Sequence, residues 1–188
     1  MITMKKDILL IIISLIVNSI GYSQVVDGTI LNSKESEKDP YIELMKQASI
    51  AGQKGENEKA VEYLTQAIIM RPNESVGYSQ RGHQKLKMND FNGAIEDFTK
   101  YIELSSNNKK PFGYLNCGRA KYELKDYQGA LNDFNIAISL KPDFGYAYYY
   151  QGLAYKALNL NDKACTSFKM GKDLKDKDSK KEWIKNCK

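Results

Sequence analysis

The chain contains little of the chemistry on which most enzymes and metal sites depend. Among its 188 residues there are one histidine, three cysteines and four prolines. A single histidine, His83, removes most routes to a multi-histidine metal site or to a Ser-His or Cys-His catalytic pair. The sequence also lacks a glycine-rich phosphate loop, a GxSxG motif and an HExxH motif. We therefore expect no catalytic residues, no metal site and no cofactor.

Long apolar runs and charge of one sign are scarce as well. Hydrophobic residues make up 42% of the chain, charged residues make up 27%, and the formal net charge is only +5. The apolar run at residues 8–20 is interrupted by polar residues and is shorter than the roughly 20 residues that span a bilayer. These values exclude a polytopic membrane protein and indicate a soluble body of one domain or two small ones.

Residues 1–23 have the three-part layout of a secretory signal peptide. Lys5 and Lys6 precede the apolar run, and Gly21 and Ser23 supply the small residues of a cleavage site. We expect cleavage after Ser23 and export of the mature protein, which would be periplasmic or secreted; the alternative is an uncleaved membrane anchor. Residues 24–40 show no helical periodicity and end in a charged stretch, which predicts a flexible N-terminal lead.

Positive charge is concentrated at the C-terminal end. Residues 169–188 hold eight lysines against four acidic residues. Such a lysine-rich stretch is most often a solvated helix face, and a patch for acidic surface polymers or phospholipid is the alternative. A near-neutral body and an export signal argue against nucleic-acid binding.

A repeat of about 34 residues organises the chain from residue 41 onward. We place four units at residues 41–74, 75–110, 111–144 and 145–178. Two antiparallel helices approach closely only where side chains are small, so small residues at fixed places predict a helix hairpin in each unit. The eighth and twentieth places hold only such residues: Ala48, Gly82, Gly118 and Gly152, then Ala60, Ala94, Ala130 and Ala164.

The expected turns carry matching signals. Gly55, Asn89 and Asn159 occupy the turn of three units, and both residue types tolerate the left-handed conformation that ends a helix. Asp90 and Asp126 follow where an acidic side chain can cap the second helix. Other carboxylates of the second helices are expected to point to solvent or to the convex side: Glu96, Asp97 and Asp133.

A family resemblance is carried by two stretches, YSQRGHQKLKMNDFNGAIEDFTKYIEL (78–104) and YLNCGRAKYELKDYQGALNDFNIAISLKP (114–142). Both resemble the tetratricopeptide repeat, and the likeness extends over residues 41–178. It implies an all-α, right-handed superhelix, or solenoid, of four helix-turn-helix repeats, of the exported bacterial type. Residues 179–188 then correspond to the capping helix that closes such arrays, with Trp183 and Ile184 packing inward.

The three cysteines receive different roles. Cys117 takes the seventh place of unit three, where the repeat usually buries leucine, and is expected in the core. Cys165 lies on the second helix of unit four, on which the capping helix with Cys187 is expected to pack. A disulfide between these two would close a loop of 22 residues and stabilise the fold by about 3 kcal/mol. Two unrelated cysteines are the alternative.

By family analogy, the first helices line a concave groove that holds peptides or protein segments. The residues at groove-facing places are polar, basic and aromatic: Gln80, His83, Asn116, Arg119, Tyr122, Tyr146, Tyr149 and Tyr150. Arg119, Tyr149 and Tyr150 are the preferred hot spots, because aromatic residues bring large contact area and arginine brings forked hydrogen bonds. Core packing is the competing interpretation for the tyrosines, and an ordinary polar surface role is the competing one for His83.

The resemblance implies a non-catalytic scaffold that binds a protein or peptide partner of unknown identity. Some family members clamp a C-terminal carboxylate with lysine, asparagine and arginine side chains, but only Asn116 matches that pattern here. The alternatives are a structural subunit of a cell-envelope assembly and a carrier of a small ligand or glycan fragment in the aromatic groove. Membrane contact is expected only through an uncleaved leader.

Overall fold

The computed structural model describes residues 25–26, 29–30 and 39–187. The chain divides into two compact units, residues 1–40 and 41–188. In the first, β1 (Val25–Val26) pairs antiparallel with β2 (Thr29–Ile30). This short pairing falls in the stretch predicted as a flexible lead, while the predicted signal peptide, residues 1–23, lies outside the described residues. In the described part of the chain, no helix is both long and apolar enough to cross a bilayer.

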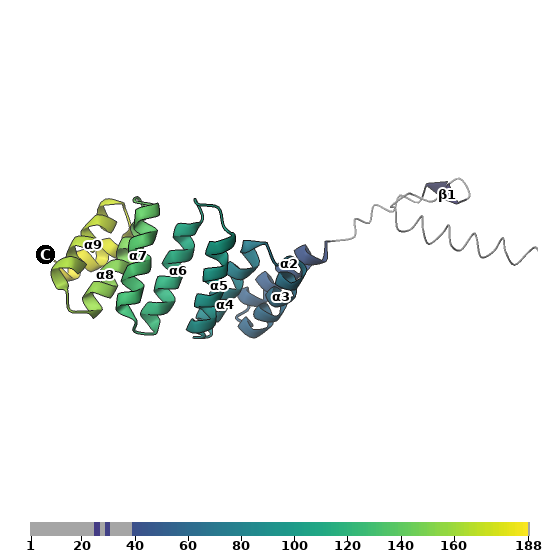
Figure 1. Cartoon of the computed structure of the whole chain (residues 1–188), viewed down its shortest axis with the longest axis horizontal. Coiled ribbons are helices and arrows are strands. Elements are labelled where there is room, and N and C mark those ends of the chain that lie inside the picture. Colours follow the sequence, from purple (N-terminus) through teal and green to yellow (C-terminus); the bar gives the residue numbers. More distant parts are fainter. Residues whose placement is uncertain (1–24, 27–28, 31–38, 188) are drawn as a thin grey trace, which may run out of the picture. The chain divides into compact units, whose positions relative to one another are not determined.

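The second unit is built of helix pairs that follow the repeat. The pairs are α2 (Pro40–Gln53) with α3 (Asn57–Met70), α4 (Ser75–Lys87) with α5 (Phe91–Leu104), α6 (Lys110–Glu123) with α7 (Tyr127–Leu140), and α8 (Gly145–Ala157) with α9 (Asn161–Asp173). A last helix, α10 (Lys177–Asn186), follows them. Figure 1 shows the pairs side by side in a row. The predicted all-α helical solenoid is confirmed.

The small residues of the repeat make room for one phenylalanine in each of the last three units. A Cβ atom added to Gly82 would lie 2.9 Å from the Phe98 ring, and one added to Gly118 would lie 2.5 Å from the Phe134 ring. Gly152 faces Phe168 in the same way. All three rings are fully buried. The two helices of a pair therefore touch through glycine on the first helix and phenylalanine on the second.

The turns inside the hairpins adopt the predicted conformation. Gly55, Asn89 and Asn159 all have positive φ angles, at 80°, 60° and 60°. Unit three uses Lys125 at φ 64° instead, which the turn pattern does not predict. The two predicted caps are present, because the carboxylates of Asp90 and Asp126 accept hydrogen bonds from backbone N–H groups three residues later, at 3.0 Å and 2.9 Å.

Two carboxylates expected at the surface are buried instead. Asp97 is 3% exposed, and its two oxygens accept from Arg81 Nη2 at 2.7 Å and Nε at 2.9 Å. Lys85 Nζ lies 3.0 Å from the same carboxylate. Asp133 is 7% exposed and forms an ion pair with Lys121 at 2.8 Å. The surface prediction is wrong for both because their helix face packs against basic residues of the first helix, whereas it holds for Glu96, which is exposed.

The seventh place of the repeat links neighbouring hairpins through polar side chains. In unit two, Arg81 also donates to Thr65 Oγ1 of the preceding hairpin at 3.1 Å. In unit four, Gln151 donates to Asn135 of the preceding hairpin at 2.7 Å and accepts from Ser167 of its own hairpin at 2.6 Å. Unit three has Cys117 at this place, buried as predicted.

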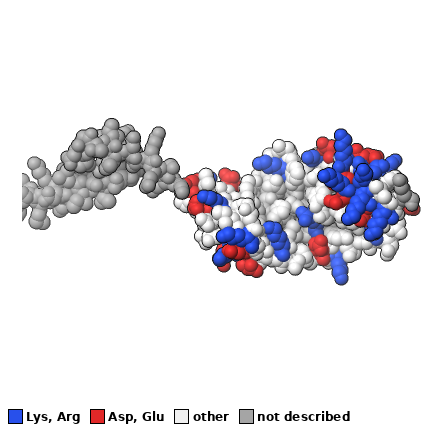
Figure 2. Space-filling model, turned by 180° about the vertical axis from the view of Figure 1, so that it is seen from behind, with Lys and Arg blue, Asp and Glu red and all other residues white. Residues whose placement is uncertain are grey.

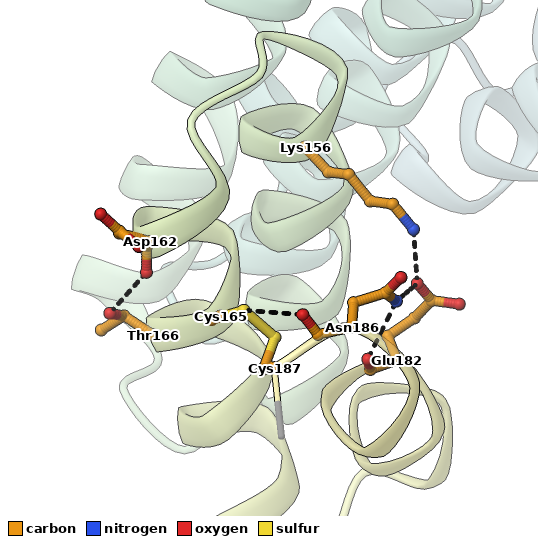
Figure 3. The surroundings of a disulfide bond; sticks show 7 residues. All are labelled: Lys156, Asp162, Cys165, Thr166, Glu182, Asn186 and Cys187. Carbon is orange, nitrogen blue, oxygen red and sulfur yellow. Dashed lines mark hydrogen bonds and ion pairs between the residues drawn. A yellow bond between two sulfur atoms is a disulfide. The ribbon is translucent and has the colours of Figure 1, made fainter.

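The C-terminal helix is fastened to the last hairpin at several points (Figure 3). A disulfide joins Cys165 of α9 to Cys187, with a Cα–Cα distance of 5.5 Å and the sequence separation of 22 anticipated above. Ser179 of α10 is fully buried against Gly171. The predicted inward packing of Ile184 is wrong: its side chain is 50% exposed, because α10 turns the smaller Ser179 toward the body.

Candidate functional site

The first helices α2 and α4 enclose a hollow of about 310 Å³. Two predicted groove residues, Gln80 and His83, contribute to its wall. Helix α2 contributes Ala48, Ser49, Gly52 and Gln53, and α3 contributes Leu64. Two further residues of α4 that the prediction did not name, Gln84 and Lys87, complete the lining. The hollow is therefore lined by three amide side chains, one histidine and one lysine over a small apolar floor, which suits hydrogen bonding to a peptide backbone.

His83 is held in one orientation at the edge of this hollow. Its Nδ1 lies 2.7 Å from the carbonyl oxygen of Ser79, and since a carbonyl only accepts, Nδ1 carries the proton and donates. The ring stands edge-on to Phe98 with the centroids 5.1 Å apart. Burial lowers the pKa of His83, and the nearby charge of Arg119 lowers it further. The ring is thus neutral at neutral pH, with Nε2 as an acceptor.

A second hollow, of about 240 Å³, lies between α4 and α6. Leu86, Asn89, Phe91, Arg119 and Glu123 line it. Arg119 lines this second hollow, and its charge also lowers the pKa of His83 in the first. The second hollow therefore combines polar, apolar and oppositely charged groups.

Arg119, which lines the second hollow, also contacts an aromatic cluster on α8. Its guanidinium carbon lies 5.2 Å from the centre of the Tyr150 ring, and its Nη1 donates to Asn116 Oδ1 at 3.3 Å. The Tyr150 hydroxyl lies 3.1 Å from that of Tyr146. Tyr149 stacks on Tyr146 with the centroids 6.0 Å apart. Burial raises the pKa of Tyr150, so its hydroxyl stays protonated.

The structure separates the predicted groove residues into three groups, which are the aromatic cluster, the lining of the first hollow, and two residues that belong to neither. Arg119 and the tyrosines at 146, 149 and 150 form the aromatic cluster, and Gln80 and His83 line the first hollow. Asn116 is only 7% exposed and orients Arg119 rather than facing a groove. Tyr122 packs against Tyr127 of α7, with the ring centroids 5.3 Å apart. We call the two hollows and the aromatic cluster together the groove surface.

Two charged residues of the groove surface were missed, and a signal for them was present. Lys87 lines the first hollow and Glu123 lines the second. Both fall at the thirteenth place of their units, a groove-facing place by family analogy. The groove surface therefore carries charges of both signs, Lys87 in the first hollow and Arg119 with Glu123 in the second.

Comparison with known proteins identifies the repeat. Two sequence models described as the tetratricopeptide repeat match the chain, one over residues 44–74 and the other over residues 146–170. The chain therefore contains tetratricopeptide repeats. Repeats of this family form scaffolds for protein–protein interaction, and four hairpins with a groove surface on their first helices give this tetratricopeptide-repeat protein the same architecture.

Several solved structures share its fold. A crystal structure of MamA is 24% identical, with a TM-score of 0.67 over 76% of this chain and 83% of that one. The Arabidopsis OM64 TPR domain is 26% identical, with a TM-score of 0.57 over 62% of this chain and 95% of that one. The first TPR of Spaghetti (RPAP3) bound to HSP90 peptide SRMEEVD is 24% identical, with a TM-score of 0.54 over 59% and 88%. No curated protein matches the chain in sequence.

Proposed function

We propose that this tetratricopeptide-repeat protein binds an extended segment of a partner protein along its groove surface. The observation that carries the proposal is the cluster in which Arg119 lies over the Tyr150 ring while Tyr146 and Tyr149 extend it. Arginine and large aromatic side chains dominate the energy of protein interfaces. Mutual packing already restricts these side chains, so ordering them on binding costs little entropy.

The chemistry of the groove surface favours a segment that carries a carboxylate beside an apolar or aromatic side chain. Arginine has five N–H donors, and Asn116 accepts at one nitrogen of Arg119, which leaves donors for a carboxylate. Gln80 and the Nε2 atom of His83 offer hydrogen bonds to the segment's backbone in the first hollow. A neighbour of the same fold holds an HSP90 peptide, which supports peptide binding as a use of this fold.

We further propose that the role is non-catalytic. The buried carboxylates are engaged within the fold, Asp97 by Arg81 and Lys85 and Asp133 by Lys121. Paired in this way, they serve the packing of each hairpin rather than proton transfer to a substrate.

Export to an oxidising compartment is the third part of the proposal. The disulfide between Cys165 and Cys187 supports it, because such bonds persist in the periplasm and outside the cell and are rare in the cytosol. Cell fractionation, together with the mass of the purified protein, tests both export and cleavage after Ser23. A full-length protein found only in the cytosol would contradict this part.

The groove proposal is tested by comparing proteins captured from the envelope fraction with wild type and with variants. Arg119→Ala and Tyr149→Ala remove cluster side chains and leave Tyr150 in contact with the buried Phe134. Lys100→Ala is the control, because Lys100 is an exposed residue of the second helix α5. Thermal unfolding of each variant establishes that the fold is intact.

We expect both cluster variants to lose the same captured proteins and Lys100→Ala to keep them. Loss of one interface hot spot costs about 2 kcal/mol or more, which weakens affinity by at least about thirtyfold. Retention of every captured protein by both cluster variants, together with loss in the control, would place the binding surface elsewhere.

A further inference from the structure

Helix α10 has two chemically different sides. On the inward side, Ser179 is buried against Gly171, and Glu182 forms an ion pair with Lys156 of α8 at 3.0 Å. The carboxylate of Asp176 accepts from the Ser179 N–H at 2.7 Å and so caps the helix. Two of the acidic residues at this end of the chain are therefore used in holding the helix in place.

The outward side of α10 presents four exposed lysines around one isoleucine. Lys177, Lys180, Lys181, Ile184 and Lys185 recur at the three- and four-residue spacing of one helix face and line a shallow depression of about 510 Å³. Figure 2 shows Lys and Arg gathered at the end of the body that holds α9 and α10. We call these five residues the lysine face.

The lysine face differs from the face through which a first helix packs on the second helix of its pair. Ser179 is the third residue of α10, and the third residues of α4 and α8, Gly77 and Ala147, are likewise small and buried. By this correspondence α10 takes the position of a first helix. Its eighth residue is Ile184, where α4 and α8 have the glycines that admit a phenylalanine. A second helix paired with α10 would thus meet a bulky side chain among exposed lysines, so the face suits an anionic surface instead.

We propose that the lysine face binds the surface of an anionic phospholipid bilayer. Four ammonium groups on long stems can reach lipid phosphates while Ile184, which lines the same depression, enters the headgroup layer. An exposed apolar residue among lysines fits a bilayer better than a soluble polyanion, which offers charge but no apolar layer. This lipid site shares no residue with the groove surface and goes beyond the proposed function.

The rigidity of α10 strengthens this interaction. The disulfide fixes its C-terminal end, and the Lys156–Glu182 ion pair fixes its middle (Figure 3). The Ser179–Gly171 contact fixes its beginning. Because the helix is already held in place before binding, the four lysines can contact the bilayer together without an entropy cost for ordering the backbone.

The test is cosedimentation of the full chain, with its disulfide intact, with phosphatidylcholine vesicles that contain or lack phosphatidylglycerol. Each lysine near an anionic surface is worth about a fivefold change in affinity, so Lys180→Gln with Lys181→Gln should weaken binding to phosphatidylglycerol vesicles about thirtyfold. The charge-matched control is Lys54→Gln with Lys109→Gln, both exposed and in turns outside α10. All variants share residues 1–40, so any contribution of that segment is equal in all of them.

The second variant separates a bilayer from a soluble polyanion. Ile184→Ser should weaken vesicle binding at least about threefold while leaving binding to polyphosphate unchanged. Circular dichroism verifies the fold, and if the first lysine pair loses helix, Lys177→Gln with Lys185→Gln provides the same test. The proposal is overturned if the lysine pair behaves like its charge-matched control, or if Ile184→Ser binds vesicles like wild type, which would assign the face to a soluble polyanion.

Discussion

Replacing Asp97 with asparagine should destabilise the fold far more than the same change at Asp133. Asp97 is the shared partner of Arg81 and Lys85, whose side chains are only 18% and 17% exposed. Asp97→Asn leaves both cations buried without a counter-charge, and breaking a buried pair in this way costs about 3–5 kcal/mol. This is a large share of the about 5–15 kcal/mol by which a domain is stable.

Asp133 provides the matched comparison. It has the same place in the next repeat, but its partner Lys121 is 29% exposed and can turn toward water. Burial raises the pKa of Asp133, and the ion pair with Lys121 offsets only part of this shift. The ionised form of Asp133 is therefore stabilised less by the fold than the short distance to Lys121 suggests. We expect Asp133→Asn to cost about 1 kcal/mol or less, as for a partly exposed pair.

Urea unfolding followed by far-ultraviolet circular dichroism measures both changes, with the disulfide left intact in every sample. The variant that combines Asp97→Leu, Arg81→Met and Lys85→Met should recover most of the lost stability, because apolar residues of similar volume replace a buried ion pair well. Equal costs for Asp97→Asn and Asp133→Asn, or no recovery in the combined variant, would refute the reasoning that uncompensated buried cations cause the loss.

Three further predictions concern single features of the repeat body. The thiol of Cys117 should not react with Ellman's reagent until the protein unfolds, since burial raises its pKa to about 12; modification of the folded protein would contradict this. Stability should fall as the pH drops below about 6.5, because the pKa of His83 is lower in the folded chain than in the unfolded chain. In that pH range the unfolded chain binds a proton at His83 that the folded chain does not bind. In His83→Gln this part of the pH profile should flatten, and an identical profile would assign it to other groups. Cys165→Ser with Cys187→Ser should lower stability by about 3 kcal/mol and speed hydrogen exchange in α10, and unchanged exchange there would show that the other contacts hold the helix alone.

The fold was predictable because its main constraint is steric and local in sequence. Gly82, Gly118 and Gly152 recur at a fixed place, and no larger residue fits against the phenylalanine opposite. The left-handed turn residue Lys125 was not predictable, because closure of the hairpin imposes φ 64° on a residue type with no preference for it.

Asp97 and Asp133 were wrongly predicted to be exposed, although the sequence contains a signal for their burial. Asp97 follows Lys85 by twelve residues, and Asp133 follows Lys121 by the same interval, which brings acid and base together across each hairpin. An acidic residue on a helix is usually solvated, so that general expectation hid the specific pairing.

The candidate site was predictable in position but not in exposure. Family places put Arg119 and the α8 tyrosines on the first helices, where the structure has them. Whether such a side chain is open to a partner depends on its neighbours in space. Asn116 belongs to α6, which packs against α5 on one side and α7 on the other, and this burial cannot be read from its place in the repeat.

The position of Trp183 determines what fluorescence can report about this molecule. It is the single tryptophan of the chain, and it lies on α10 with the ammonium group of Lys172 about 4.0 Å from its ring centre. Many of the thirteen tyrosines, by contrast, lie in the hairpins. Tryptophan emission therefore follows the detachment of one helix, whereas circular dichroism follows the loss of all of them. Two melting curves that do not coincide would reveal the C-terminal helix leaving before the hairpins separate.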